Sequence, residues 1–352
     1  MAEFIELNGD YGSGGGQILR TALGLSTLLQ KPFSIDKIRY NRPVPGLQAQ
    51  HLTALTTLRQ ICNAQIEGAR LLSQEVKFSP QAPRAAQLHV NIGTAGSVTL
   101  LLQSIILPAL LHEIRLRIVG GTDVAWAPSV NYMQNVLLPA LAKMNAKFDL
   151  ELNARGYFPK GLGSASFSSK PAKLPLKPLS LANFGNLERI RIISHCANLP
   201  KEVALNQLKS AKKSITDALG NLDLEEKVEC REKSETTGSG IDLFAYFSSG
   251  AVLGANALGE KGKPAEKVGR EAAEKLLKEL SAKKPCDSHL ADQLIPFMAL
   301  AQGYSTIETT ALTEHTQTNI FVVEKFLDVK FEVSGNLHEP AEISVMGAGF
   351  KQ

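Results

Sequence analysis

Residues 14–63 read "GGGQILRTALGLSTLLQKPFSIDKIRYNRPVPGLQAQHLTALTTLRQICN" and set a pattern that recurs along the chain. Apolar residues stand at helical spacing from 14 to 30, so a helix is predicted there. Residues 31–39 alternate as a strand does, a proline-rich loop covers 40–48, and a second helix is predicted at 49–63. One unit therefore consists of a helix, a strand, a loop and a helix.

Two later stretches repeat this order of elements. The second has a predicted helix at 93–111, a strand at 112–121, a loop at 122–128 and a helix at 129–145. The third has a helix at 289–303, a strand at 304–312, a loop at 313–319 and a helix at 320–328, before a strand-like run at 329–335. Repetition at a long period indicates a body built from repeated units.

An additional segment separates the second and third units. Its predicted elements are strands at 187–195, 224–230 and 241–248 and helices at 200–220 and 268–283, with a run at 257–267 that reads as mobile. The Pro- and Lys-rich stretch 168–180 marks its entry. We therefore predict an α/β (α+β) fold in which residues 1–183 and 285–352 form a three-repeat body and residues 184–284 form an inserted α/β domain. If the repeats pack with pseudo-threefold symmetry, their equivalent loops gather at one end.

Composition favours a globular chain that can bury a core. Of 352 residues, 44% are hydrophobic and 20% are charged, which argues against disorder. The net charge of +4 permits a nucleic-acid partner without requiring one. The four cysteines form no C-x-x-C pair, which argues against a zinc knuckle or a disulfide framework. The chain begins without a signal-peptide pattern, and Gln103 and Pro108 interrupt its longest apolar run, so we expect a cytoplasmic protein with no membrane span.

Glycines crowd the start of the first predicted helix, in "GSGGGQ" at 12–17. Free backbone amides at a helix N-terminus favour anions, so this loop suits a phosphate, and a tight turn without function is the alternative. The stretch is not a Walker motif, because no Lys-Ser/Thr pair follows it. It also lacks the dinucleotide fingerprint, whose third glycine would stand at Gln17.

The loop of the first unit and the helix after it carry Arg39, Arg42, Gln50 and His51. The planar guanidinium group pairs with two phosphate oxygens at once, and a proline-stiffened turn keeps the two arginines together. These residues favour a phosphate site, with capping of a strand end as the alternative.

The loops of the second and third units carry an aromatic residue and a histidine. Trp126, between Asp123 and Pro128, suits stacking on a base, but a structural plug is the favoured interpretation. His315 precedes the last predicted helix and suits a nucleophile, a base or a metal ligand, with a structural role as the alternative. No second histidine stands at ligand spacing, which argues against zinc.

Taken together, these motifs resemble the RNA 3′-terminal phosphate cyclase family. The matching stretches follow the family order: "GGGQILRTAL", "IRYNRPVPGLQAQHLTAL", "GTAGSVTLLLQSIILPAL", "GGTD", "GYFPKGLG", "LADQLIPFMALA" and "HTQTNI". The resemblance implies three repeats, each a four-stranded sheet with two helices, similar to the C-terminal domain of translation initiation factor three, plus a smaller inserted domain.

The resemblance also implies an ATP-dependent reaction in three steps. A histidine attacks the α-phosphorus of ATP, forms a histidine–AMP adduct and releases pyrophosphate. AMP then moves to an RNA 3′-phosphate, giving a 3′-pp-5′-A end. Finally the neighbouring 2′-OH closes a 2′,3′-cyclic phosphate and expels AMP. Covalent catalysis of this kind divides one difficult condensation into easier transfers.

By its motif, His315 matches the family nucleophile. The positions that match the family's ATP- and phosphate-binding residues are Gln17, Arg20, Arg39, Arg42, Gln50, His51, Gln103, Asp292, Gln293 and Asn319, with Pro128 and His289 as candidates to pack on adenine. The family usually has a glutamate, implicated in holding a divalent metal (Mg²⁺ or Mn²⁺), where this chain has Ser13. The metal ligand is therefore unassigned, with Asp10 as a candidate.

Two other functions stay open at this stage. One is a non-catalytic, RNA-binding ribosome-assembly factor of the same fold, which the complete "HTQTNI" motif disfavours. The other is an enolpyruvyl transferase, which would need a different set of basic ligands. The inserted helix carries four lysines, Lys201, Lys209, Lys212 and Lys213. They suit a surface that faces RNA, but a helix face exposed to water is the favoured interpretation. The oligomeric state is not predicted.

Overall fold

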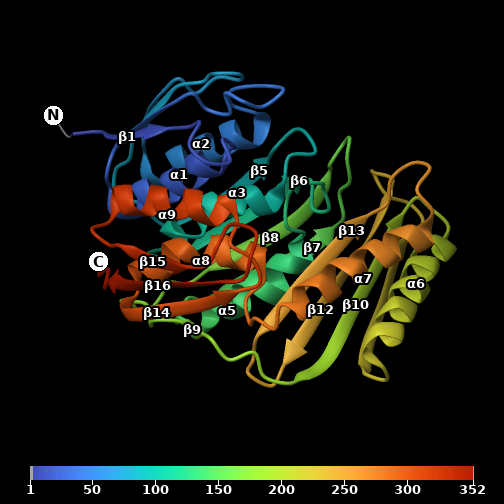
Figure 1. Cartoon of the computed structure of the whole chain (residues 1–352). Helices are drawn as coiled ribbons and strands as arrows, with labels where there is room; N and C mark the ends of the chain where they lie inside the picture. Colours follow the sequence, from blue (N-terminus) through green and yellow to red (C-terminus); the bar gives the residue numbers. More distant parts are fainter. Residues whose placement is uncertain (1–2, 352) are drawn as a thin grey trace.

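Four four-stranded sheets organise the computed structural model, which describes residues 3–351 (Figure 1). The first sheet has the order β1-β2-β4-β3 and consists of β1 (Ile5–Asn8), β2 (Phe33–Asp36), β4 (Val76–Ser79) and β3 (Gln65–Glu67). Its first two strands are parallel and its other pairs are antiparallel.

The second and third sheets repeat this arrangement. The second consists, in order, of β5 (Ala86–Asn91), β6 (Ile114–Gly120), β8 (Gly163–Ser169) and β7 (Phe148–Ala154). The third consists of β9 (Ser180–Leu181), β14 (Gln302–Thr309), β16 (Ala341–Ala348) and β15 (Phe331–Ser334). In each, the first two strands are again parallel and the rest antiparallel. The α/β class and the repeated four-stranded sheets are thus confirmed, while the likeness to the initiation-factor domain stays a prediction.

The helices of the three repeats lie inside and the sheets lie outside. α1 (Gln17–Leu29), α3 (Val98–Ile105) and α8 (Ser288–Leu300) are apolar around most of their circumference and almost wholly buried. In β6, by contrast, buried and exposed residues alternate, because one face packs on the helices and the other meets solvent. Figure 1 shows α1, α3, α8 and α9 (Glu314–Phe326) between the sheets.

The second helix of each repeat completes the interior. α2 (Ala49–Cys62) and α9 are continuous, whereas the helix predicted at 129–145 consists of α4 (Val130–Tyr132), a π turn (Met133–Leu137) and α5 (Leu138–Lys143). α3 ends before Pro108, which begins a 3₁₀ turn at Pro108–Leu110. Among residues 3–351, no helix combines the length and the apolar character needed to cross a membrane.

The segment between β9 and α8 forms the fourth sheet. Its strands, in the order β11-β10-β12-β13, are β11 (Asp223–Arg231), β10 (Leu187–Ala197), β12 (Gly238–Phe247) and β13 (Val252–Leu258). α6 (Lys201–Leu219) and α7 (Ala265–Ser281) pack against it around a separate cluster that includes Ile190, Leu243 and Leu276. The strand order differs from that of the repeats, so this segment is not a fourth copy. The predicted domain bounds stay a prediction.

Three sequence-based assignments were wrong. β13 was not predicted, and the run 257–267 contains the end of β13 and the start of α7. α9 begins at Glu314 and not at 320, because the Thr313 side chain accepts a hydrogen bond from the amide of Thr316. The helix predicted at 289–303 begins at Ser288, behind the capping residue Asp287, and ends at Leu300, because β14 begins at Gln302.

Candidate active site

The glycine loop lets other parts of the chain approach the start of α1. Gly12 and Gly14 have φ values of 58° and 55°, which glycine adopts without strain. A Cβ atom on Gly16 would lie 2.1 Å from Nε2 of His51. Glycine at position 16 therefore allows the buried imidazole to reach the first turn of α1.

The start of α1 differs from those of three neighbouring helices. Ser97, Asp287 and Thr313 cap α3, α8 and α9 by accepting hydrogen bonds from amides of the first turn. Within residues 3–351, no side chain caps α1, and its first turn holds no acidic residue. The first amides of α1 thus keep their hydrogen-bonding capacity and the positive end of the helix dipole for an anion.

His315 stands beside this helix start, in the first turn of α9. Its Nδ1 contacts Oε1 of Gln17 and lies 3.3 Å from Oγ of Ser13. The amide nitrogen of Gln17 donates to the carbonyl oxygen of His315 at 3.0 Å, so Oε1 is the end that faces the ring. An acceptor against Nδ1 places the ring proton there, which leaves the lone pair on Nε2.

Polar side chains join the three central helices. Arg20 Nε of α1 donates to Oε1 of Gln103 in α3 at 3.2 Å, and Gln103 Nε2 donates to Oε1 of Gln293 in α8 at 3.1 Å. Gln17 Nε2 lies 3.4 Å from Oδ2 of Asp292, also in α8. Asn319 of α9 donates to the Asp292 carbonyl at 2.6 Å. These bonds form two sets, one of Arg20, Gln103 and Gln293 and one of Gln17, Asp292 and Asn319, which meet at the neighbouring positions 292 and 293 of α8. We call the two sets together the polar group.

Three arginines of the site, Arg20 of the polar group and Arg39 and Arg42 near it, have no acidic partner. In the described part of the chain, Arg20, Arg39 and Arg42 form no ion pair with a carboxylate, and Nε of Arg39 is buried without a hydrogen-bond partner. Burial lowers the pKa of Arg20 to about 10, and Arg39 acts in the same direction, against Asp292. Arg42 Nη2 donates to the carbonyl of Ser13 at 2.7 Å. Guanidinium groups left unpaired in this way suit a phosphate.

His51 and Gln50 place the start of α2 against this site. The Gln48 amide donates to Nδ1 of His51 at 3.0 Å, so the ring carries its proton on Nε2, toward Gly16. Burial lowers the pKa of His51 to about 3, with Arg20 and Arg39 adding to the effect, so the ring is a neutral donor. Gln50 Oε1 accepts from the amide of Ser97 at 2.9 Å and thereby joins α2 to the start of α3.

The surroundings of His315 and Asp292 shift both pKa values toward the neutral form. Burial lowers the pKa of His315 below its ordinary value, and the positive charges of Arg20, Arg42 and His289 lower it further. Burial likewise raises the pKa of Asp292 to about 7, although His289 and Arg20 oppose the shift. The imidazole of His315 is consequently available as a nucleophile at neutral pH.

The predicted metal candidates lie on the glycine loop. Oδ1 of Asp10 contacts the Asn41 amide group and would lie 3.4 Å from a Cβ on Gly14. Asp10 is therefore next to Ser13, but Ser13 itself offers only a hydroxyl and a backbone carbonyl that Arg42 already uses.

The residues predicted near adenine, His289 and Pro128, lie in α8 and beside α3, respectively. His289 is exposed, its ring meets Tyr132 edge to face at 6.3 Å, and its carbonyl accepts from Gln293 Nε2 at 2.7 Å. Pro128 is half-buried, and its carbonyl accepts from Thr99 Oγ1 at 2.7 Å. The interpretation of Trp126 as a structural plug was wrong, because the indole is exposed and packs into no core. The α6 lysines are exposed, and Lys212 pairs with Glu226.

The structure contains a second buried cluster, which no sequence motif indicated. Asp123, His195 and Asp242 have ligand-type atoms within 4.8 Å of one another. The two carboxylates already accept hydrogen bonds: Arg155 bonds Asp123 at 2.9 Å, and Ser129 and Asn131 bond Asp242 at 2.6 and 2.8 Å. These hydrogen bonds satisfy both carboxylates, so the cluster is a structural network that joins the second repeat to the insert. Only the fold unites residues so far apart in sequence, so no local motif could reveal them.

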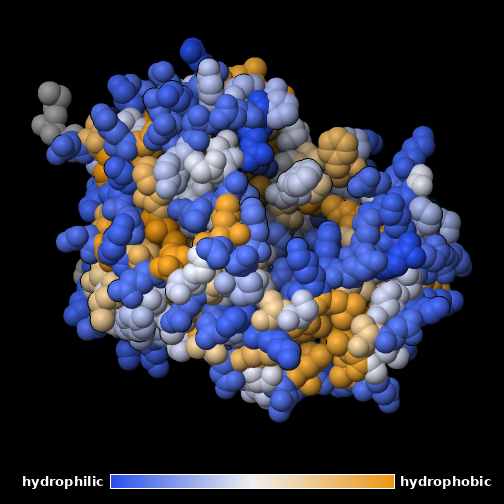
Figure 2. Space-filling view, in the orientation of Figure 1, coloured by the Kyte–Doolittle hydropathy of each residue, from blue (hydrophilic) through white to orange (hydrophobic). Residues whose placement is uncertain are grey.

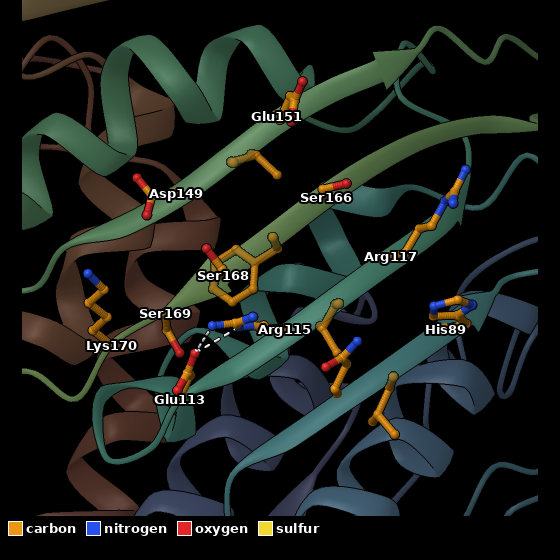
Figure 3. Close-up of a pocket in the computed structure, with 15 residues that line it drawn as sticks. His89, Glu113, Arg115, Arg117, Asp149, Glu151, Ser166, Ser168, Ser169 and Lys170 are labelled. Atoms are coloured by element: carbon orange, nitrogen blue, oxygen red, sulfur yellow. Dashed lines mark hydrogen bonds and ion pairs between the residues drawn. The ribbon is translucent and has the colours of Figure 1, made fainter.

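A shallow cavity of about 480 Å³ lies on the outer face of the second sheet (Figure 3). Arg115 and Arg117 of β6, Ser166 and Ser168 of β8 and Asp149 and Glu151 of β7 line it, and Arg115 pairs with Glu113 at 2.5 Å. A second cavity of about 530 Å³ adjoins Arg155 between β7, β10 and β11. Of the residues predicted to form the site, none lines either cavity.

The candidate site brings together an uncapped helix start, arginines without acidic partners and the imidazole of His315. Such an arrangement is typical of the class of enzymes that bind phosphate groups. A family model described as RNA 3′-terminal phosphate cyclase matches residues 11–333. The chain therefore belongs to the RNA 3′-terminal phosphate cyclase family, and the prediction that it is an enzyme is confirmed.

Curated relatives named RNA 3′-terminal phosphate cyclase match almost the whole chain. The relative from Methanopyrus kandleri is 45% identical over 98% of this chain and 99% of its own length. Those from Thermococcus gammatolerans and Pyrococcus furiosus are 43% and 42% identical, over 98% and 97% of this chain and 98% of each relative. A solved EPSP synthase from Acinetobacter baumannii is 11% identical and covers 99% of this chain and 66% of its own, but at a TM-score of 0.29 it is too distant to bear on fold or function.

Proposed function

We propose that this chain converts an RNA 3′-terminal phosphate to a 2′,3′-cyclic phosphate at the expense of ATP, through a covalent adduct of AMP with His315. The observation that carries the proposal is the position of His315 between an uncapped helix start and three arginines without acidic partners. The family and its named relatives support RNA end cyclisation, and the geometry supports these residues as its site.

In the first step, Nε2 of His315 attacks the α-phosphorus of ATP. A bond forms between Nε2 and phosphorus, the bond to the β-phosphate oxygen breaks, and pyrophosphate leaves. Gln17 holds the ring proton on Nδ1 and so keeps the Nε2 lone pair free. The amides at the start of α1 and the guanidinium groups of Arg20 and Arg42 stabilise negative charge on the phosphoryl oxygens.

In the later steps, the same basic groups hold the RNA end. An oxygen of the 3′-phosphate attacks the adduct phosphorus, and the phosphorus–nitrogen bond breaks to give the RNA-3′-pp-5′-A end. The 2′-oxygen then attacks the 3′-phosphorus, and AMP leaves. Arg39, Gln50 and His51 are the residues we assign to the RNA phosphate, because they extend the polar site from the start of α1 along the start of α2. Pro128 and His289 are assigned to adenine.

A divalent ion fits this site only in part. Mg²⁺ and Mn²⁺ prefer carboxylate and phosphate oxygens, and Ser13 provides neither. Asp10 is the residue that would hold the ion, together with the phosphates of the nucleotide. When bound, the ion would neutralise charge on the leaving pyrophosphate. We place the reaction in the cytoplasm, with RNA and ATP as partners.

Incubation with α-labelled ATP tests the proposal. The wild type is expected to acquire label in an acid-labile phosphoramidate, and His315→Ala and His315→Asn are expected to acquire none. Gln317→Ala is the matched control, because Gln317 is also exposed in the first turns of α9. Labelling of both His315 variants at the wild-type level would show that another residue is the nucleophile. An RNA-binding assembly factor would leave even the wild type unlabelled.

A further inference from the structure

The only tryptophan of the chain is wholly exposed. Trp126 lies in the loop between β6 and α4 with a φ of 65° and is 99% accessible to solvent. Two more aromatic rings, Phe158 at 77% and Tyr40 at 56%, project from other loops. A single exposed ring is ordinary, but apolar rings that gather on one face indicate a binding site, so the surroundings of these three decide their meaning.

The three rings belong to loops that adjoin one another. The Asp123 and Thr122 amides both donate to the carbonyl of Gly156, which joins the Trp126 loop to the Phe158 loop. A Cβ on Gly161 would lie 2.6 Å from the carbonyl of Thr94, which joins the Phe158 loop to the start of α3.

The start of α3 is in turn joined to the start of α2, which follows the first loop, through the hydrogen bond from the Ser97 amide to Gln50. We call these four loops, residues 37–47, 92–97, 122–128 and 156–162, the rim. In Figure 1 the loops at the ends of β6, β7 and β8 lie between the part with α1 and α3 and the part with β13, and Figure 2 shows the surface hollowed there.

The charges of the rim favour an anionic strand. Its basic residues are Lys37, Arg39, Arg42 and Lys160. Its sole acidic residue, Asp123, is buried and paired with Arg155 at 2.9 Å. Exposed aromatic rings beside basic groups are the combination with which proteins bind single-stranded nucleic acid, because bases stack on the rings and phosphates meet the cations.

We propose that the rim binds the nucleotides that precede the RNA 3′ end, with bases stacked on Trp126 and Phe158 and the phosphate chain running past Lys160 toward Arg42. This inference rests on the proposed function, since it places the terminal phosphate beside His315. It extends that function by assigning the enzyme a single-stranded substrate: a paired base has its faces covered and cannot stack on the rim. Trp126 and Phe158 act on binding of the strand and not on attack at ATP, whereas Arg42 serves both.

The single indole makes the test direct. Addition of a single-stranded oligoribonucleotide with a 3′-phosphate is expected to quench the fluorescence of Trp126, whereas a nucleoside 3′-monophosphate quenches little. A blunt duplex of the same sequence is expected to quench little as well. Equal quenching by the duplex would contradict stacking of unpaired bases, and the absence of quenching while RNA binds would overturn the proposal.

Variants separate this inference from the proposed function. Trp126→Ala and Phe158→Ala are each expected to weaken binding of the strand, measured by anisotropy, by roughly 5- to 150-fold, and Trp126→Phe is expected to keep most of it. Tyr304→Ala is the matched control, because Tyr304 is 52% exposed on the third sheet. Labelling by α-labelled ATP without RNA should be unchanged in all four.

Normal labelling with unchanged RNA affinity in Trp126→Ala and Phe158→Ala would refute RNA binding by the rim and leave the proposed function untouched. Absence of labelling in the wild type would refute the proposed function. Quenching by single strands in a protein that does not label would leave the rim supported and the reaction refuted, so the two failures are distinguishable.

Discussion

At the scale of single residues, a neutral side chain decides how His315 can react. Gln17 bonds the backbone of His315 through its nitrogen and faces Nδ1 with its oxygen, so the amide fixes the ring orientation and the tautomer together. The sequence indicates Gln17 as a candidate phosphate-binding residue and gives no sign that it contacts a histidine. Its relation to His315, 298 positions away, appears only when α1 and α9 pack together.

The pH dependence of adduct formation follows from the charges around His315. Only the neutral imidazole attacks phosphorus, and burial with Arg20 and Arg42 holds the pKa below the ordinary value of 6.5. The rate should therefore rise with pH along an acidic limb below 6.5 and then level off. Arg42→Gln removes a positive charge that disfavours the imidazolium, so the limb should move to higher pH.

Labelling rates across pH in the wild type and in Arg42→Gln measure this shift, since the position of the limb is independent of the maximal rate. Arg59→Gln is the control, because Arg59 lies in the last turn of α2, away from the glycine loop. A limb that stays in place, or moves to lower pH, would mean that Arg42 does not act on the charge of His315.

Ser13 offers a test of metal use. Ser13→Glu supplies a carboxylate beside Asp10, so it should lower the Mg²⁺ or Mn²⁺ concentration needed for half-maximal adduct formation. The measurement is a metal titration of labelling in the wild type and the variant, with Ser13→Gln as the uncharged control. Superimposable titration curves for the wild type and Ser13→Glu would show that this loop does not contribute to metal binding.

At the scale of elements, the glycines at the start of α1 differ in how closely other side chains approach them. A Cβ on Gly16 collides with His51, which is buried and held at Nδ1 by Gln48, whereas a Cβ on Gly15 has Arg42 Nη2 as its nearest neighbour at an ordinary 3.4 Å. Gly16→Ala should therefore destabilise the protein by about 1–3 kcal/mol and slow labelling, while Gly15→Ala leaves stability nearly unchanged.

Thermal unfolding and labelling of the two variants check this difference. Equal stabilities would indicate that His51 moves aside at no cost, and the close approach would then have no structural importance.

Elements with strong apolar patterns could be predicted from sequence, and those set by capping or pairing could not. α1 and β6 follow the expected periods. The predicted start of α9 was wrong because Thr313 caps the helix ahead of the polar "HTQTN", which has no apolar stripe. β13 was missed because its small residues gain their place only by pairing with β12. His315 consequently lies in a helix and not in a loop.

At the scale of the whole molecule, the site forms where three repeats meet. The sequence could indicate that the equivalent loops of the repeats gather at one end, and the family motifs could name His315 and the arginines as candidates. It could not show that Arg20, Gln103 and Gln293 bond one another across α1, α3 and α8, since each contact joins distant parts of the chain. The likeness of the repeats therefore predicts the position of the site, and packing determines its hydrogen bonds.

The buried network between the second repeat and the insert should hold the two together. Burial alone would lower the pKa of Arg155, but Asp123, Glu229 and Asp242 outweigh it and raise that pKa above its ordinary range. Arg155→Met leaves these carboxylates uncompensated and should cost about 3–5 kcal/mol of unfolding free energy. Arg115→Met, which breaks the exposed pair with Glu113, should cost about 1 kcal/mol or less.

Chemical denaturation of both variants measures the two costs. A loss for Arg155→Met no greater than that for Arg115→Met would contradict a stabilising role for the network.

Transfer of label from the isolated adduct tests the central claim most directly. The protein is labelled with α-labelled ATP, freed of nucleotide, and mixed with otherwise identical RNAs that end in a 3′-phosphate or a 3′-hydroxyl. We expect the label to leave the protein only with the 3′-phosphate RNA, to appear first on the RNA end and then as free AMP, and the RNA to gain a 2′,3′-cyclic phosphate. Label that stays on the protein, or that moves equally to both RNAs, would contradict the account.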